Sequence, residues 1–237
     1  MNEAEWLASD NARDMLNCIP GGAPSARKAR LLAVAFCRCS DRLMRNSQYR
    51  PALDLAERFA DGDATDTELA ESYRYFNTRA MELREYDSER QIRRWALTVA
   101  LLNALRSPVA DPGDAVWNLD RSAPTPFGMR LANLCRDVCG NPFEPINPPW
   151  LFADSAASAR WLPQLARWRF DERCRTETAV TLARQMYDSR EFGAMPILAD
   201  ALQDAGCDNP AILDYCCDAN QPHVRGCWVC DLVLGFS

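Results

Sequence analysis

Hydrophobic residues recur every three or four positions along most of the chain, which is the spacing of amphipathic α-helices. The first long stripe follows Ser25 and predicts a helix, capped by that serine, to about Asn46. Thr65 and Glu68 form a capping-box pattern, in which each side chain accepts a hydrogen bond from the other residue's backbone N–H, and they predict another helix start. No comparable two-residue alternation between hairpin turns indicates strands. The pattern therefore predicts an all-α, multi-helix globular fold.

Further helices are expected where similar stripes lie between proline and glycine, which favour the first turn and the C-terminal turn of a helix, respectively. The last apolar segment, Trp228–Leu234, follows Pro222. A helix that began near Pro222 would place His223, Cys227 and Cys230 on one buried face. The other predicted helices are Leu53–Phe59, Arg90–Arg106, Pro126–Cys139, Thr176–Arg190, Pro196–Ala205 and Pro210–Tyr215.

A proline-rich stretch interrupts this pattern. Four of the ten residues from 141 to 150 are prolines, which lack an amide donor and disfavour helix in the preceding residue. We therefore expect an extended segment that crosses the surface. The resulting organisation is an N-terminal helical region over residues 1–140, a proline-rich connection over 141–151, and a smaller C-terminal helical region over 152–237 that is rich in cysteine at its end.

The counts of reactive side chains exclude several classes of protein. The chain has 27 basic and 33 acidic residues and a net charge of −6, which disfavours a protein that mainly reads phosphate backbones. His223 is the only histidine and Lys28 the only lysine, so multi-histidine metal sites within one chain and the lysine-containing phosphate-binding loop are excluded. Neither GxGxxG nor GxSxG occurs. Because no catalytic signature is present, we expect a non-catalytic protein.

Charge is distributed unevenly between neighbouring predicted helices. The segment from Pro24 to Arg45 contains six basic residues and one acid, whereas Leu53–Glu89 contains eleven acids and four arginines. The two segments can pair inside the fold, or the basic one can bind an acidic partner or nucleic acid. The residues of this candidate partner-binding face are Arg27, Lys28, Arg30, Arg38, Arg42 and Arg45.

Two features predict a cytoplasmic protein that does not enter a membrane. The segment Met1–Trp6 is acidic and lacks the basic-then-apolar pattern of a secretory signal. The longest apolar stretch, Ala96–Leu105, is shorter than the ~20 residues needed to span a bilayer. In a reducing compartment the eleven cysteines are expected to be thiols or metal ligands rather than disulfides.

The C-terminal segment contains the densest group of residues that could carry chemistry. Zinc prefers four nitrogen or sulfur ligands in a tetrahedron, and Cys227-x2-Cys230 has the spacing of a local ligand pair. A structural zinc is the first hypothesis. The second is that the cysteines pack as small buried hydrophobic residues. A third hypothesis is a nucleophilic thiol, with His223 lowering the pKa of Cys227. The group comprises Cys207, Cys216, Cys217, His223, Cys227 and Cys230.

Several stretches resemble a group of uncharacterised Cys/Arg-rich helical proteins predicted from planctomycete genomes. The resemblance implies a shared fold and no named activity. In that pattern position 230 is usually aliphatic, which favours Cys207, Cys216, His223 and Cys227 as zinc ligands, with Cys217 and Cys230 as substitutes. The similar stretches are Glu3–Leu7, Arg27–Arg38, Ala56–Gly62, Gly140–Phe143 with Pro145, Trp150–Leu151, Pro196–Leu202 with Asp204–Cys207, and His223–Val229.

Three functions follow from these observations. The favoured one is a non-catalytic helical accessory module that binds a protein partner, with one structural zinc as a candidate cofactor. The first alternative is a cysteine-dependent enzyme that uses Cys227 with His223. The second is a nucleic-acid accessory protein that uses the basic face between Arg27 and Arg45.

Overall fold

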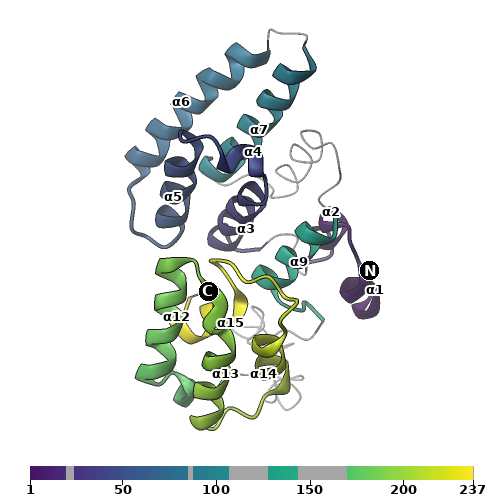
Figure 1. Cartoon of the computed structure of the whole chain (residues 1–237), viewed down its shortest axis with the longest axis vertical. Coiled ribbons are helices and arrows are strands. Elements are labelled where there is room, and N and C mark those ends of the chain that lie inside the picture. The colour runs from purple at the N-terminus through teal and green to yellow at the C-terminus, as the bar shows by residue number, and fades with distance from the viewer. Residues whose placement is uncertain (20–23, 85–87, 107–127, 144–169, 237) are drawn as a thin grey trace, which may run out of the picture.

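The structure is a computed structural model, and it describes residues 1–19, 24–84, 88–106, 128–143 and 170–236 (Figure 1). These residues form helices joined by turns and contain no strand, so the predicted all-α class is confirmed. The N-terminal helices are α1 (Glu3–Ala8), α2 (Ala12–Leu16), α3 (Ala26–Arg38), α4 (Asp41–Met44), α5 (Tyr49–Ala60), α6 (Asp66–Arg84), α7 (Glu89–Leu105) and α9 (Gly128–Cys139). The C-terminal helices are α12 (Glu177–Ser189), α13 (Met195–Asp204), α14 (Pro210–Cys217) and α15 (Trp228–Leu234), with short 3₁₀ turns at Glu172–Cys174 and Phe192–Ala194.

The predicted helix caps are present where the sequence placed them. The Ser25 side chain accepts a hydrogen bond from the backbone N–H of Lys28 and starts α3. Thr65 and Glu68 form the expected reciprocal pair at the start of α6, with N···O distances of 2.8 and 3.2 Å. Such caps satisfy backbone donors that the first turn of a helix leaves unpaired.

The helix predicted from Ser25 to Asn46 is wrong in length, because α3 ends at Arg38. Ser40 is extended, with φ −87° and ψ 106°, and a separate short helix, α4, follows it. The turn brings Leu43 into the core, where it is completely buried. Packing of this side chain therefore overrides the continuous helical periodicity of the sequence.

Two further expectations concern the proline-rich part of the chain. The predicted helix start at Pro126 lies outside the described residues, and α9 is described from Gly128 onward. Most of the predicted connection over 141–151 also lies outside them, since the description stops at Phe143 and resumes at Phe170.

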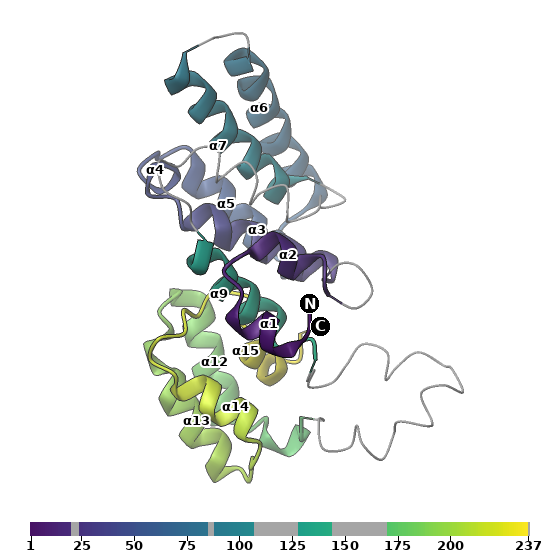
Figure 2. The same ribbon diagram turned by 90° about the vertical axis from the view of Figure 1, so that its right-hand side faces the viewer.

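Two hydrophobic cores organise the described residues. The first is built from α1 to α7 and α9 and contains the fully buried Trp6 and Phe36. The second is built from α12 to α15 and contains the fully buried Leu198 and Cys227. Figures 1 and 2 show α6 and α7 at one end of the molecule, α12 to α14 at the other, and α3 and α9 between them.

The segment between α14 and α15 lies against the first core. Gly226 has φ +99°, and a Cβ atom at this position would lie 3.1 Å from Cβ of Leu31 in α3. The Gly226 backbone N–H donates a hydrogen bond to the hydroxyl of Tyr187 in α12. Glycine thus allows this loop to approach α3 closely and brings charged groups from both cores together. We call the place where the loop, α12 and α15 meet α3, α5 and α9 the junction.

Candidate functional site

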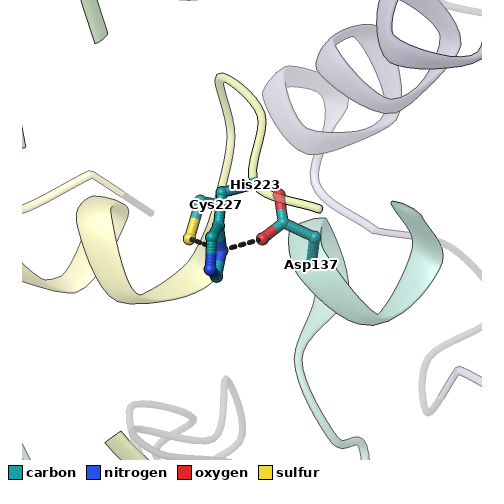
Figure 3. Close-up of side chains that lie close together, drawn as sticks. All are labelled: Asp137, His223 and Cys227. Atoms are coloured by element: carbon teal, nitrogen blue, oxygen red, sulfur yellow. Dashed lines mark hydrogen bonds and ion pairs between the residues drawn. The ribbon is translucent and has the colours of Figure 1, made fainter. Parts of the chain in front are cut away.

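Three chemically different side chains meet where α9 contacts the loop before α15 (Figure 3). Oδ1 of Asp137 lies 3.0 Å from Nδ1 of His223, and Sγ of Cys227 lies 3.9 Å from the same nitrogen. One ligand atom from each residue lies within 4.8 Å of the other two. Asp137 and Cys227 are completely buried, and the His223 side chain is 8% exposed. In the part of the chain that the structure describes, no other group of three or more His, Cys, Asp or Glu residues has its ligand atoms this close together.

Each of the three side chains is placed by a different local feature. Asp137 lies on α9, next to Val138 of the first core, and is completely buried. Its Oδ1 accepts a hydrogen bond from the Tyr215 hydroxyl at 2.5 Å, and its Oδ2 accepts one from the backbone N–H of Val224 at 2.8 Å. The latter bond fixes the loop beside His223. Cys227 is the N-cap residue of α15.

The loop corrects the expectation of a helix that begins near Pro222. The helix α15 begins at Trp228, and His223 lies before it. The carboxylate of Asp137 binds the backbone of Val224 and the ring of His223, and this holds the segment as a loop. His223, Cys227 and Cys230 therefore do not share one helical face.

The electrostatic surroundings favour a charged imidazole next to a protonated thiol. Burial acts to lower the pKa of His223, but hydrogen bonds with Asp137 and Cys227 and the nearby negative charge outweigh it and raise the pKa to about 9. Burial raises the pKa of Cys227 well above its ordinary value, and the neighbouring Cys230 and Asp137 add to this effect. Burial and Asp137 also raise the pKa of the Tyr215 hydroxyl.

The arrangement contains the residue types of a cysteine–histidine–aspartate triad but not its geometry. In such a triad the acid holds one ring nitrogen while the other nitrogen activates the thiol. Here Asp137 and Cys227 both lie next to Nδ1 of His223. Complete burial also keeps the Cys227 thiol from solvent and from a substrate. The geometry is more suitable for binding a cation or fixing the junction than for nucleophilic attack.

The structure brings together only part of the predicted zinc-ligand set. His223 and Cys227 belong to the close group, whereas Cys207 and Cys216 are buried nearby but are not members of it in the described chain. The other cysteines are placed differently again. Cys217 is exposed, and Cys230 is buried with its sulfur 3.7 Å from Sδ of Met195.

The predicted basic face contributes three of its residues to ion pairs inside the molecule. Arg27 binds Asp61 and Asp231, and Lys28 binds Asp231 at 2.6 Å. The interpretation that neighbouring segments of opposite charge pair with each other is confirmed by Arg38, which binds Asp54 and Glu57. Because Arg190, which follows the last residue of α12, also binds Glu57, these acids connect the two cores.

The other residues of that face differ from one another. Arg30 is buried; its guanidinium donates to the carbonyl of Ala104 and lies 4.7 Å from the centre of the Phe59 ring. Burial lowers the pKa of Arg30 to about 10. Arg45 is exposed, and the side chain of Arg42 lies outside the described part.

Sequence reasoning missed the acids at the junction, most importantly Asp137, Asp231 and Asp61. A signal was present for two of them. Asp231 interrupts the apolar segment Trp228–Leu234, and Asp137 directly precedes the apolar Val138 and Cys139. An acid within an apolar run is expected to be buried and paired, but the sequence does not identify the partner when it lies more than 80 residues away.

None of the described helices combines the length and apolar character needed to cross a membrane. The resemblance to planctomycete proteins remains a prediction from the sequence. No protein-family model, curated protein or solved structure matches this chain.

Proposed function

We propose that the protein is a non-catalytic helical module that binds a protein partner through the outward face of α6. The observation that carries this proposal is the exposure of two large apolar side chains on one protruding helix. Tyr75 is 53% exposed and Met81 is 55% exposed. The helix lies against α7 at the end of the molecule farthest from α13 (Figure 1).

The composition of this face supports the proposal of a protein interface. A shallow depression along α6 is lined by Arg74, Tyr75, Thr78, Arg79 and Glu82. Tyrosine and arginine are enriched among residues that dominate binding energy at interfaces. Methionine, seven residues after Arg74 and therefore on the same side of the helix, adapts its shape to different apolar partners. Apolar anchors surrounded by charged groups favour a protein partner over a small polar ligand.

The two alternative functions have less support. Arg27 is paired with Asp61 and Asp231, and Lys28 is paired with Asp231, so these basic residues are poorly placed to bind phosphates. Cys227 is buried as a thiol, which does not favour a cysteine-dependent enzyme.

A cytoplasmic location belongs to the same proposal. All eleven cysteines are free thiols in the structure, which agrees with a reducing compartment.

The proposal is tested by affinity capture from an extract of the native host, with chemical crosslinking to retain weak complexes. The test variant combines Tyr75→Glu with Met81→Glu. The matched control is Ile197→Glu, because Ile197 is 57% exposed on the distant helix α13. We expect one protein to be captured by the wild type and the control and lost with the double variant. Equal capture by all three proteins, each with unchanged helical circular dichroism, would refute α6 as the binding face.

A further inference from the structure

The junction contains a set of donor atoms that matches the preferences of a zinc-like cation. Asp137 provides a carboxylate oxygen, His223 a ring nitrogen and Cys227 a sulfur, and all three atoms lie within 4.8 Å of one another. The three residues come from α9, from the loop after α14 and from the start of α15. A ligand bound here would connect the first core to the second.

The position of Nδ1 provides the geometric argument. This one nitrogen faces both Oδ1 of Asp137, at 3.0 Å, and Sγ of Cys227, at 3.9 Å. A single proton on Nδ1 can be donated well to only one of these atoms. A cation between the three atoms can contact all of them. In a zinc tetrahedron with bonds of about 2.0–2.3 Å, neighbouring ligand atoms lie about 3.3–3.6 Å apart, which is between the two observed separations.

We propose that Asp137, His223 and Cys227 bind one divalent metal ion of the zinc type through Oδ1, Nδ1 and Sγ. Binding requires the Cys227 thiol to release its Sγ proton and the His223 ring to release its Nδ1 proton to solvent, because zinc takes thiolate and neutral imidazole as ligands. Imidazole and thiolate select zinc over magnesium or calcium, which prefer oxygen ligands. The proposal is independent of the α6 surface.

Neighbouring groups are suitably placed to orient the carboxylate. The backbone N–H of Val224 holds Oδ2 of Asp137, so Oδ1 is the oxygen directed at His223. The hydroxyl of Tyr215 donates to the same Oδ1, and its ring packs edge-on against the imidazole, with centroids 5.2 Å apart. Hydrogen bonds of this kind fix the orientation of metal ligands and increase affinity. Tyr215 is therefore a positioning residue of the proposed site.

The first experiment uses the unmodified full chain, purified without a metal-affinity tag or chelator. Its zinc content is measured by elemental analysis, and zinc is then replaced by Co²⁺ for absorption spectroscopy. We expect about one zinc per chain, and a cobalt complex with a thiolate-to-metal charge-transfer band and the strong visible bands of tetrahedral coordination. A chain that has no zinc and gives no thiolate–cobalt band when Co²⁺ is added overturns the proposal and leaves a hydrogen-bonded Asp137–His223 pair.

The second experiment identifies the ligands. Cys227→Ser and Asp137→Asn should each abolish tight Zn²⁺ binding, whereas Cys216→Ser and Cys230→Ser are matched controls because both cysteines are buried nearby but outside the close group. Tyr215→Phe should weaken Zn²⁺ binding by roughly tenfold, as expected for a group that orients a ligand. Loss of the charge-transfer band in Cys216→Ser with its retention in Asp137→Asn would overturn this ligand set. Helical circular dichroism, recorded on each variant, separates loss of the site from loss of the fold.

Discussion

Asp231 binds Arg27 with both of its carboxylate oxygens, although the two residues are 204 positions apart. The two guanidinium nitrogens donate over 2.8 and 3.1 Å. Lys28 binds the same carboxylate, and the hydroxyl of Tyr187 donates to it. Arg27 also binds Asp61, which in turn binds Arg225 from the loop before α15. These buried ion pairs join α3 and the end of α5 in the first core to α15 and the loop before it. Bidentate geometry of this kind is specific as well as strong.

The stability provided by Asp231 is expected to depend on pH. Burial acts to raise the pKa of Asp231, but the charges of Lys28 and Arg27 outweigh it and hold the pKa below its usual range. A carboxyl with a lowered folded-state pKa stabilises fully above its unfolded pKa, about 3.9, and loses this contribution as the pH falls through the folded value. The difference in unfolding free energy between wild type and Asp231→Asn should therefore be constant from about pH 5 to 7 and shrink below about pH 4.

Urea unfolding at a series of pH values measures this difference. Glu172→Gln is the control, because the Glu172 side chain is 83% exposed in its pair with Arg175 and should change the urea midpoint little. If the difference in unfolding free energy between wild type and Asp231→Asn grows as the pH is lowered, the carboxylate is not paired as described.

A second set of ion pairs at the junction joins Glu57 and Asp54 to two arginines. Replacing either acid should change the free energy of unfolding by a different amount. Glu57 is 3% exposed and Asp54 is 47% exposed, yet both bind Arg38 and Arg190. Glu57→Gln should reduce the unfolding free energy by about 3 kcal/mol, since it leaves partly buried arginines without their main partner. Asp54→Asn should cost less than about 1 kcal/mol because water already screens this carboxylate. Chemical denaturation gives both values, and equal losses would contradict the assigned burial.

Two glycines have the same backbone requirement but different surroundings. Comparing their alanine variants separates the cost of backbone strain from the cost of steric crowding. Gly226 has φ +99° and Gly206 has φ +91°, so alanine is strained at either position. A Cβ atom at 226 would also meet the side chain of Leu31 at 3.1 and 3.2 Å, whereas nothing lies within 4 Å at 206. Gly206→Ala should cost about 1–2 kcal/mol, and Gly226→Ala about 1–3 kcal/mol more because the junction must move apart. Thermal unfolding of the two variants provides the comparison, and a smaller loss at 226 than at 206 would count against close packing of the loop on α3.

Thiol labelling tests whether Cys227 is reactive. Cys217 is exposed and should be alkylated first at neutral pH. Cys227 is completely buried, and burial raises the pKa of its thiol, so it should be labelled only when the protein unfolds. Mass spectrometry after short exposure to iodoacetamide distinguishes the two sites. Faster labelling of Cys227 than of Cys217 would instead favour the cysteine-dependent enzyme.

The sequence was sufficient to predict the helices, because hydrophobic periodicity and helix caps depend on residues that are close together in the chain. Ser25, Thr65 and Glu68 cap the helices that they predict. The break after Arg38 was not predictable in this way, since it depends on burying Leu43 in a core built from other helices.

The candidate site was only half predictable for the same reason. His223 and Cys227 are four residues apart, and their types alone indicate metal or thiol chemistry. Asp137 joins them from 86 residues upstream, a distance over which local patterns carry no information. The basic residues of α3 were recognised as a group, but their partners Asp61 and Asp231 are fixed by the packing of two separate cores.

Buried charge pairs at the junction hold the two cores together, and a double-mutant cycle on Arg27 and Asp231 tests this most directly. Urea unfolding of wild type, Arg27→Met, Asp231→Asn and the double variant gives the coupling energy between the two residues. We predict a coupling of about 1–3 kcal/mol, with the double variant less destabilised than the sum of the single variants. Additive single effects, with a coupling below about 0.5 kcal/mol, would contradict the claim.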